Sequence, residues 1–425
     1  MIDIREHGIG KGGLTPTDSI LSSYTVASGE TIKAGNLVNF TGGNQVKKCY
    51  LKRIKAEIPY NFYNGVYSSS ASCRIDETRV FVAYVVSSTL KMFVMTLGND
   101  FISQSTEVTH ASSWSPTNLT VLPLSNNKIL VLKLRTCFIA TINGTDITQG
   151  MDYQIGDMTG GFDIVKLKDK QAMLVYQAGD VDIHGNALII NISDSDIITT
   201  IVGARVVDTR MSSIKCQKIS DTLYLCTSFA GSTYGGHQCF IININNGVIT
   251  ERSIYPSNNS QVPVSVGAFY IEGYDNIIPL SDNTALLVFT DSNKKLNQVL
   301  ITITGTTVTS FLKGDMLVNA PLSPSIFKSS DGGIIGVGID TLIPTNSYIY
   351  SFDITQGILA LKEEIPGNSA ISSTKGFFLE DNIIMENFTA SAKSFIKIIR
   401  ATPFAQGMAK NNGTTGQSIK VYKFR

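Results

Sequence analysis

The sequence has few charged residues. They make up 16% of the 425 residues, below the roughly 25% of ordinary soluble proteins. Lys and Arg total 35 and Asp and Glu total 34, which leaves a formal net charge of +1. Without a basic excess, counterion release from a nucleic acid supplies little binding energy, so we expect no nucleic-acid partner.

The chain also lacks long apolar runs and closely spaced cysteines. No stretch approaches the roughly 18 apolar residues of a membrane-spanning helix, and residues 1–11 lack the apolar run of a signal peptide. We therefore expect synthesis in a cytoplasm and no membrane insertion. The six cysteines include no C-x-x-C pair, a pattern that indicates buried, reduced thiols.

Motifs of catalysis and cofactor binding are missing too. No P-loop, dinucleotide fingerprint, H-E-x-x-H or G-x-S-x-G occurs. The four histidines lie in distant parts of the chain, and the pair His237 and Cys239 supplies only two zinc ligands. Residues 180–185 open like a calcium loop, but His184 stands where Asp or Asn belongs and Asn191 where the bidentate Glu belongs. We predict no catalytic residue, no metal and no cofactor.

What the sequence does have is a repeat of about fifty residues, the length of one propeller blade. Each copy runs from a polar turn through an apolar strand, a variable loop and a second apolar strand to a tight polar turn; the clearest copy spans Leu280–Ser310. Spacings of 43 to 61 residues separate the turn anchors Asp76, Asn126, Asp169, Asp221, Asp282, Asp331 and Asp381. Seven such units without a helical period predict an all-β, seven-bladed β-propeller.

The last unit lacks an outer strand of its own. Six units end in a tight turn followed by a strand, whereas Ser394–Ala401 runs straight on into Thr402 and Pro403. An unpaired strand edge invites aggregation. We therefore expect the spare strand within Gln45–Ile58 to pair with the last blade, so that an N-terminal strand closes the propeller.

Two short segments, 1–44 and 401–425, remain outside the propeller domain of residues 45–400. Each is too short to hold a core alone, and both have strand-like patterns. A closed propeller brings its chain ends together, so we predict one small β appendage formed by both termini.

Two patterns at the ends, S-G-E-T-I-K-A-G-N-L-V-N-F and G-M-A-K-N-N-G-T-T-G-Q-S-I-K-V-Y, resemble the small β modules of tailed-bacteriophage virion proteins. The repeat L-S-D-N-T-A-L-L-V-F-T-D … V-L-I-T-I-T-G-T-T-V-T is similar to repeat-containing tail or minor structural proteins of phages of Clostridia-like hosts. The resemblance implies a virion component whose appendage docks to other tail or baseplate proteins.

Function on a rigid scaffold is usually carried by variable loops. The long loops belong to units three to five, and the crossover His110–Leu119 carries the only tryptophan. Exposed aromatic side chains suit sugar rings or protein patches. We predict that a host-surface glycan or protein contacts Trp114, Tyr234, His237, Tyr255 and Tyr274. The alternative is that these side chains pack beneath their own loops.

Together these features predict a non-enzymatic phage structural protein, a tail or baseplate appendage that contributes to host-surface recognition. One alternative is a capsid or neck decoration protein without a receptor role. The other is a glycan-degrading propeller, with Asp182, Glu272 and Asp275 as loop carboxylates. A retaining glycosidase needs two carboxyl groups about 5 Å apart, which no sequence pattern establishes.

Overall fold

The computed structural model describes most of the repeat and parts of both ends. The described residues are 20–27, 31–32, 34, 37–42, 45–48, 52–56, 59–97, 102–113, 119–125, 127–156, 158–179, 184–207, 211–229, 237–255, 276–290, 296–313, 322–328, 334–339, 347–355, 358–366, 371–380, 383–403, 407–409 and 412–423. Every regular element within these ranges is a β-strand, which confirms the all-β prediction. Among them no helix is long and apolar enough to cross a membrane.

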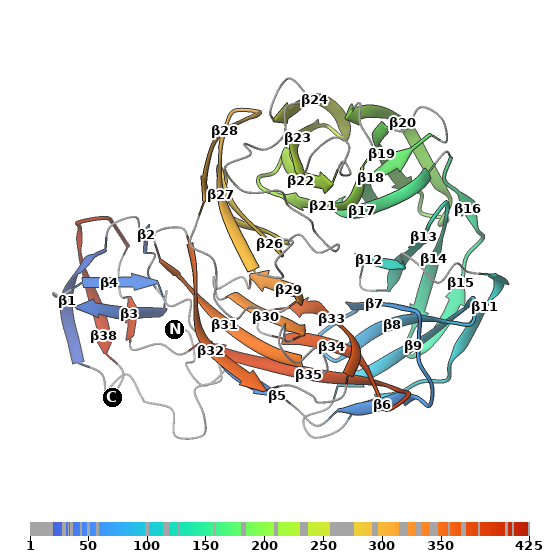
Figure 1. Cartoon of the computed structure of the whole chain (residues 1–425), viewed down its shortest axis with the longest axis horizontal. Helices are drawn as coiled ribbons and strands as arrows, with labels where there is room; N and C mark the ends of the chain where they lie inside the picture. The colour runs from blue at the N-terminus through green and yellow to red at the C-terminus, as the bar shows by residue number, and fades with distance from the viewer. Residues whose placement is uncertain are drawn as a thin grey trace.

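Seven antiparallel sheets stand around a common centre, with the first strand of each sheet innermost (Figure 1). Blades one to three comprise β7 (Ser69–Arg74), β8 (Arg79–Val86), β9 (Thr89–Leu97), β10 (Ile102–Gln104) and β11 (Val108–Ser113); β12 (Thr120–Ser125), β13 (Lys128–Lys133), β14 (Thr136–Asn143), β15 (Asp146–Gln149) and β16 (Tyr153–Gln154); and β17 (Met158–Lys168), β18 (Gln171–Ala178), β19 (His184–Ile192) and β20 (Ile198–Val207).

Blades four to seven continue the same order. They comprise β21 (Ser212–Lys218), β22 (Leu223–Phe229), β23 (His237–Asn245) and β24 (Val248–Tyr255); β25 (Asn276–Ser281), β26 (Thr284–Thr290), β27 (Leu296–Thr304) and β28 (Thr307–Lys313); β29 (Leu322–Lys328), β30 (Ile334–Ile339), β31 (Ser347–Thr355) and β32 (Ile358–Pro366); and β33 (Ile371–Glu380), β34 (Ile383–Ala390) and β35 (Lys393–Pro403). The seven-bladed propeller predicted from the repeat is confirmed.

The four-stranded pattern gives the ring two different faces. The hairpin face carries the turns between first and second strands and between third and fourth strands. The loop face carries the connections between second and third strands and the crossovers to the next blade. Four predicted anchors, Asp76, Asp169, Asp221 and Asp282, lie in first-to-second turns on the hairpin face.

The hydrophobic core is divided into layers between neighbouring blades. In β18 every residue is buried, and alternate side chains serve different layers. Leu174 and Tyr176 pack toward blade two, whereas Met173 and Val175 pack toward blade four. Because both faces of a blade are covered, its strands read as continuous apolar runs, and these runs were the signal of the repeat.

Hydrogen bonds of one repeated type join the inner strands. The side chain of Ser69 accepts from the Leu119 N–H of the next blade at 3.4 Å, and Asn276 accepts from the Ile326 N–H at 3.0 Å. In both pairs the partners are 50 residues apart. The repeat length therefore sets which polar inner-strand residue meets which backbone group.

An N-terminal segment closes the ring, as predicted. The strand β5 (Lys52–Ala56) pairs antiparallel with β35, from Ala56 opposite Ile399 to Lys52 opposite Pro403. The strand β6 (Tyr60–Tyr63) pairs with the beginning of β35. The closing segment begins later than the expected Gln45, because β4 (Gln45–Lys48) pairs with another part of the chain.

Aromatic side chains fill the seam that this segment completes. Phe62 of β6 is 7% exposed and lies edge-on to Tyr84 of blade one, with 5.1 Å between the ring centroids. Its ring centroid also lies 5.7 Å from that of Phe93. Closure therefore buries apolar surface as well as a strand edge.

The two ends of the chain form one closed barrel outside the ring (Figure 1), which confirms the predicted appendage. Its strands are β1 (Ile20–Val26), β3 (Leu37–Gly42), β4, β36 (Gly407–Ala409) and β38 (Ser418–Lys423), and β2 (Thr31–Ile32) pairs beside it with β37 (Gly413–Thr414). The predicted boundary at residue 44 falls between β3 and β4, and β35 continues past residue 400 to Pro403.

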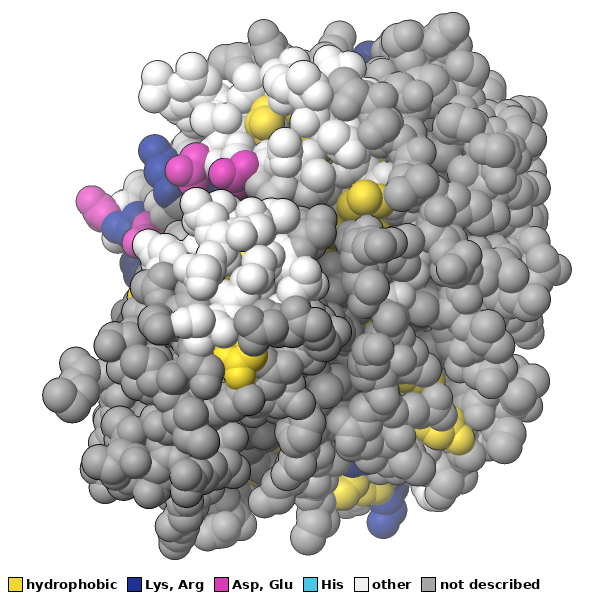
Figure 2. All heavy atoms as spheres, turned by 90° about the vertical axis from the view of Figure 1, so that its left-hand side faces the viewer, with side chains coloured by type: hydrophobic (Ala, Val, Ile, Leu, Met, Phe, Trp, Pro, Cys, Tyr) yellow, Lys and Arg dark blue, Asp and Glu magenta, His cyan; other side chains and the backbone are white. Residues whose placement is uncertain are grey.

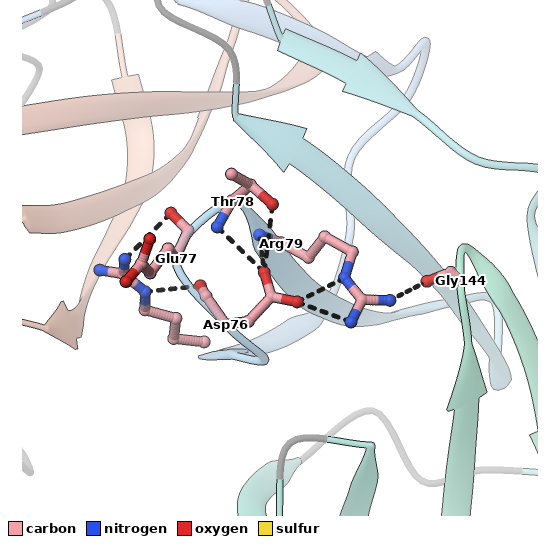
Figure 3. A network of polar contacts seen from close by, with 6 residues as sticks. Asp76, Glu77, Thr78, Arg79 and Gly144 are labelled. Atoms are coloured by element: carbon pink, nitrogen blue, oxygen red, sulfur yellow. Dashed lines mark hydrogen bonds and ion pairs between the residues drawn. The ribbon is translucent and has the colours of Figure 1, made fainter.

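Contacts on the hairpin face tie the first blades together (Figure 3). Asp76 accepts hydrogen bonds from the N–H groups of Thr78 and Arg79, and its carboxylate forms an ion pair with the Arg79 guanidinium at 2.6 Å. The same guanidinium donates to the carbonyl oxygen of Gly144 in blade two. Lys128 of blade two forms an ion pair with Asp196 of blade three, so in these two blades the first residue of the second strand reaches the outer turn of the next blade.

Candidate functional site

The predicted contact residues are only partly within the described chain. Trp114, Tyr234 and Tyr274 lie outside the described residues. His237 is the first residue of β23 and Tyr255 is the last residue of β24. The pairing of Cys239 with Tyr255 places the two backbone positions together at the loop-face end of blade four.

The loop that resembles a calcium site is described only at its end. Asp182 lies outside the described residues, as do the loop carboxylates Glu272 and Asp275. Asn191 accepts a hydrogen bond from the Gln171 amide at 2.7 Å and so belongs to the β18–β19 ladder. In the described part of the chain, no group of three or more His, Cys, Asp or Glu side chains is placed to hold a metal ion.

The loop-face end of the seam between blades one and two gathers side chains of several chemical types. His110 of β11 is 7% exposed, and its ring stacks on Phe138 of β14 with 4.7 Å between centroids. Its Nε2 atom lies 3.0 Å from the Oδ1 atom of Asp152. We call these residues, with Lys133 and Cys137, the His110 site. It lies where the crossover that carries Trp114 begins.

A break in the outer strand of blade two positions Asp152. The strand β14 pairs first with β16 and then with β15, and residues 150–152 interrupt the outer edge between them. Gly150 passes so close to β14 that an added Cβ atom would lie 3.0 Å from the carbonyl oxygen of Ile139. The interruption turns the exposed Asp152 side chain toward the neighbouring blade.

The charges of the His110 site act on the groups around it. Burial raises the pKa of the Cys137 thiol to about 12, and the Asp152 carboxylate adds to the increase. Burial lowers the pKa of Lys133, and Asp152 opposes that effect. At neutral pH the thiol is therefore protonated, so it is a poor nucleophile. The polar groups of the site are therefore a carboxylate, an imidazole and an ammonium, and the thiol is not reactive.

A second carboxylate occupies the corresponding break in blade one. Glu107, between β10 and β11, accepts a hydrogen bond from the Tyr84 hydroxyl and pairs with the Lys91 ammonium at 2.6 Å. The ammonium also lies 5.7 Å from the ring centroid of Tyr63 in the closing segment. Burial and the neighbouring Glu107 raise the pKa of Tyr84. These contacts join the closing segment to blade one.

Two opposite charges are buried together in blade seven. Glu386 of β34 is 0% exposed and Lys397 of β35 is 5% exposed, and they are directly opposite each other in the strand register. Burial lowers the pKa of Lys397, and Glu386 opposes the decrease. The ammonium lies 5.9 Å from the ring centroid of Phe388. We interpret this pair as structural, because it lies between packed strands.

Sequence reasoning identified the crossover that begins at His110, but it did not identify Asp152 as the residue that His110 contacts. The segment His110–Leu119 stood out because it holds the only tryptophan. The contact between His110 and Asp152 joins residues 42 positions apart in different blades. A histidine near the end of one outer strand and an aspartate at the interruption of the next are the signals that locate such a contact once the blades are aligned.

Comparison with known proteins gives the fold alone. No protein-family model matches the chain, and no curated protein sequence matches it. A solved protein from Lactobacillus plantarum has a TM-score of 0.50 at 11% identity, over 79% of this chain and 95% of that one. BBS1N, crystallised with ARL6DN, has a TM-score of 0.50 at 11% identity, over 83% of this chain and 97% of that one.

A candidate 6-phosphogluconolactonase from Bacteroides uniformis is similar to the same extent. Its TM-score is 0.50 at 11% identity, and the match covers 83% of this chain and 98% of that one. At this identity the shared feature is the β-propeller architecture, on which different proteins carry unrelated functions.

Proposed function

We propose that this chain is a non-enzymatic structural protein of a tailed-bacteriophage virion, a tail or baseplate appendage that helps recognise the host surface. The observation that carries the proposal is the position of the terminal barrel. The chain leaves the ring for the barrel at Lys52 and Pro403, which are paired in blade seven. Both residues lie at the hairpin face, because β35 starts from the loop-face turn at Ser391 and Ala392 and ends at Pro403. The barrel is therefore attached opposite the loop face, at which β23 begins with His237 and β24 ends with Tyr255.

The distribution of charge supports docking through the ends. Residues 1–51 and 404–425, which lie outside the ring, together hold 9 Lys and Arg against 4 Asp and Glu, a net charge of +5. Residues 52–403 hold 26 against 30, a net charge of −4. The overall charge near zero hides this separation. Opposite charges steer association and fix orientation, so the barrel suits an acidic surface on a neighbouring virion protein.

The form of the barrel indicates how it docks. A closed barrel has no free strand edge, so a partner cannot bind it by adding a strand. Figure 2 faces this side of the molecule, and the described hydrophobic side chains appear in it as separate small patches. We infer that the contact is made by polar and basic side chains, and that salt weakens it.

The loop face supports the recognition role. The variable connections of blades three to five and the crossover that carries Trp114 meet the ring there. The His110 site adds a carboxylate and an ammonium at the base of that crossover. Aromatic groups beside ionic groups are the combination that binds glycans and protein patches.

Mass spectrometry of purified particles tests the assignment to the virion. We expect the chain in particles of the phage that encodes it, and we expect charge reversal of Lys420 and Lys423 to glutamate to remove it. The matched control is charge reversal of Lys215 and Lys218 in blade four, which leaves incorporation unchanged. Absence of the wild-type chain from particles, despite its presence in infected cells, contradicts the proposal.

Labelled antibody and adsorption measurements separate the roles within the virion. We expect label at the tail or baseplate, and reduced adsorption when Tyr234 and Tyr274 are both replaced by alanine. The control is Ile197→Ala, at a 55% exposed residue in a hairpin-face turn of blade three. Label on the capsid or neck with unchanged adsorption favours a decoration protein. Release of sugars from host wall material favours the glycan-degrading alternative.

A further inference from the structure

Two cysteines of blade four face each other across adjacent strands. Cys216 of β21 and Cys226 of β22 are register partners, and their sulfur atoms lie 2.8 Å apart, with the Cys226 thiol donating to Cys216. Both are free thiols, 5% and 0% exposed.

The backbone geometry suits a covalent bond between them. Directly opposed residues of antiparallel strands have Cα atoms about 4.5 to 5.5 Å apart. Disulfides span Cα separations of about 4.4 to 6.8 Å and have an S–S bond of about 2.05 Å. The sulfur atoms therefore need to approach by less than about 1 Å, without movement of the strands.

We propose that Cys216 and Cys226 are an oxidation site, at which a peroxide converts the two thiols into a cross-strand disulfide. Hydrogen peroxide oxidises the more exposed thiol, Cys216, to a sulfenic acid and is itself reduced to water. The Cys226 sulfur then attacks the Cys216 sulfur. The S–S bond forms, the S–O bond breaks, and the hydroxyl group leaves with the thiol proton as a second water.

The surroundings make the first step slow and the second step fast. Burial raises the pKa of Cys216, and the hydrogen bond from Cys226 and the charge of Asp163 add to the increase. The Asp163 carboxylate also accepts a hydrogen bond from the Cys216 N–H at 2.8 Å, which holds β21 in place. Little thiolate forms at neutral pH, so oxidation needs a small, strong oxidant. Once the sulfenic acid exists, its partner is already in contact.

The bond ties the innermost strand of blade four to its second strand. The connecting turn is already closed by hydrogen bonds from the Ile219 and Ser220 N–H groups to the Leu223 carbonyl. The disulfide reduces the freedom of the unfolded hairpin further and raises the thermal midpoint of the chain.

Peptide mapping of the full-length chain after peroxide treatment tests the proposal. The protein is oxidised, unfolded, alkylated and cut with trypsin, which cleaves after Lys218 between the two cysteines. We expect the two peptides to be joined, with a mass lower by two hydrogen atoms and restored by a reducing agent. Recovery of both cysteines alkylated, or oxidised separately to sulfinic acids, overturns the proposal.

Variants make the assignment specific. The control variant is Cys239→Ala, which removes another buried thiol of blade four. Because the register partner of Cys239 is Thr227 and not a cysteine, we expect this variant to keep both the joined peptides and the increase in thermal midpoint. Cys216→Ala loses both responses. Cys226→Ala gives the same result by an independent route, should Cys216→Ala fold poorly. A cross-link or a midpoint increase that survives in both Cys216→Ala and Cys226→Ala contradicts the assignment.

Discussion

His110 and Asp152 meet across the seam between blades one and two, with 3.0 Å between His110 Nε2 and Asp152 Oδ1. The histidine belongs to the outer strand of one blade, and the aspartate lies where the outer strand of the next blade is interrupted. A second contact lies beside it, because the Gln149 amide donates to the Thr109 carbonyl at 3.2 Å. Two sheets formed by different repeats are thus joined by polar contacts at the loop face.

Replacement of Asp152 by alanine weakens this seam. The buried imidazole loses a charged partner, and we expect the free energy of unfolding to fall by about 1 to 2 kcal/mol. Urea unfolding measures the change. The control is Asp146→Ala, at the exposed first residue of β15 in the same blade, which changes stability by less than about 0.5 kcal/mol. Equal losses in the two variants contradict the prediction.

Removal of the Phe62 side chain tests how the ring is closed. The ring of Phe62 packs against Tyr84 and Phe93 in the completed seam, so Phe62→Ala leaves a cavity and costs about 3 to 5 kcal/mol. The control is Val66→Ala, at a residue 51% exposed, with an effect below about 0.5 kcal/mol. The comparison is made by urea unfolding, and a small loss in Phe62→Ala contradicts the packing argument.

Deletion of residues 1–58 tests the strand contribution to closure. The deletion removes β5 and leaves the outer edge of β35 unpaired over Ile399–Pro403. We expect an insoluble chain without cooperative unfolding, because an open edge promotes association. Soluble expression with the cooperativity of the full chain is the contrary result.

The Asp76 turn predicts a specific loss of stability in acid. Burial acts to raise the pKa of Asp76, but hydrogen bonds from Arg79 and Thr78 and the Arg79 charge outweigh it, and the pKa is lowered. The carboxylate therefore stabilises the fold above its ordinary pKa, and this contribution is lost as the pH falls through the lowered value. We expect Asp76→Asn to cost about 1.5 kcal/mol at neutral pH.

The difference between the wild type and Asp76→Asn should shrink below about pH 4, where the unfolded carboxyl is protonated. Urea unfolding over a pH series measures it. The matched control is Asp282→Asn, in the corresponding turn of blade five. A constant difference at all pH values shows that charge is not the cause.

The buried pair in blade seven predicts a rise of stability in alkali. The lowered pKa of Lys397 means that the folded chain releases this proton before the unfolded chain does. Stability therefore increases with pH between the lowered value and the ordinary 10.5. Lys397→Met lacks this increase. At neutral pH it costs about 3 kcal/mol, because Glu386 is left buried with its opposing charge removed.

The double variant Glu386→Gln with Lys397→Met is the control for that interpretation. Removal of both charges avoids the uncompensated carboxylate, so we expect it to recover more than half of the loss. Urea unfolding of the wild type, Glu386→Gln, Lys397→Met and the double variant gives the coupling free energy. Additive losses show that the two side chains stabilise the fold independently.

Local patterns in the sequence were enough for the architecture. The apolar runs bounded by polar turns recur because every blade buries both of its faces, so the repeat and the number of blades can be predicted from residue type alone. The unpaired end at Ser394–Ala401 predicted an N-terminal closing strand for the same reason, since a missing outer strand is a local feature.

Which residues meet across the seams was decided by the tertiary structure. Lys52–Ala56 closes the ring while Gln45–Lys48 joins the barrel, although both are short strands of similar composition. The contacts between His110 and Asp152, and between Glu386 and Lys397, depend on how neighbouring strands and blades align. A strand-forming pattern, with its period of two residues, does not specify which other strand it pairs with. Only the packing of the closed ring selects the pairing partners.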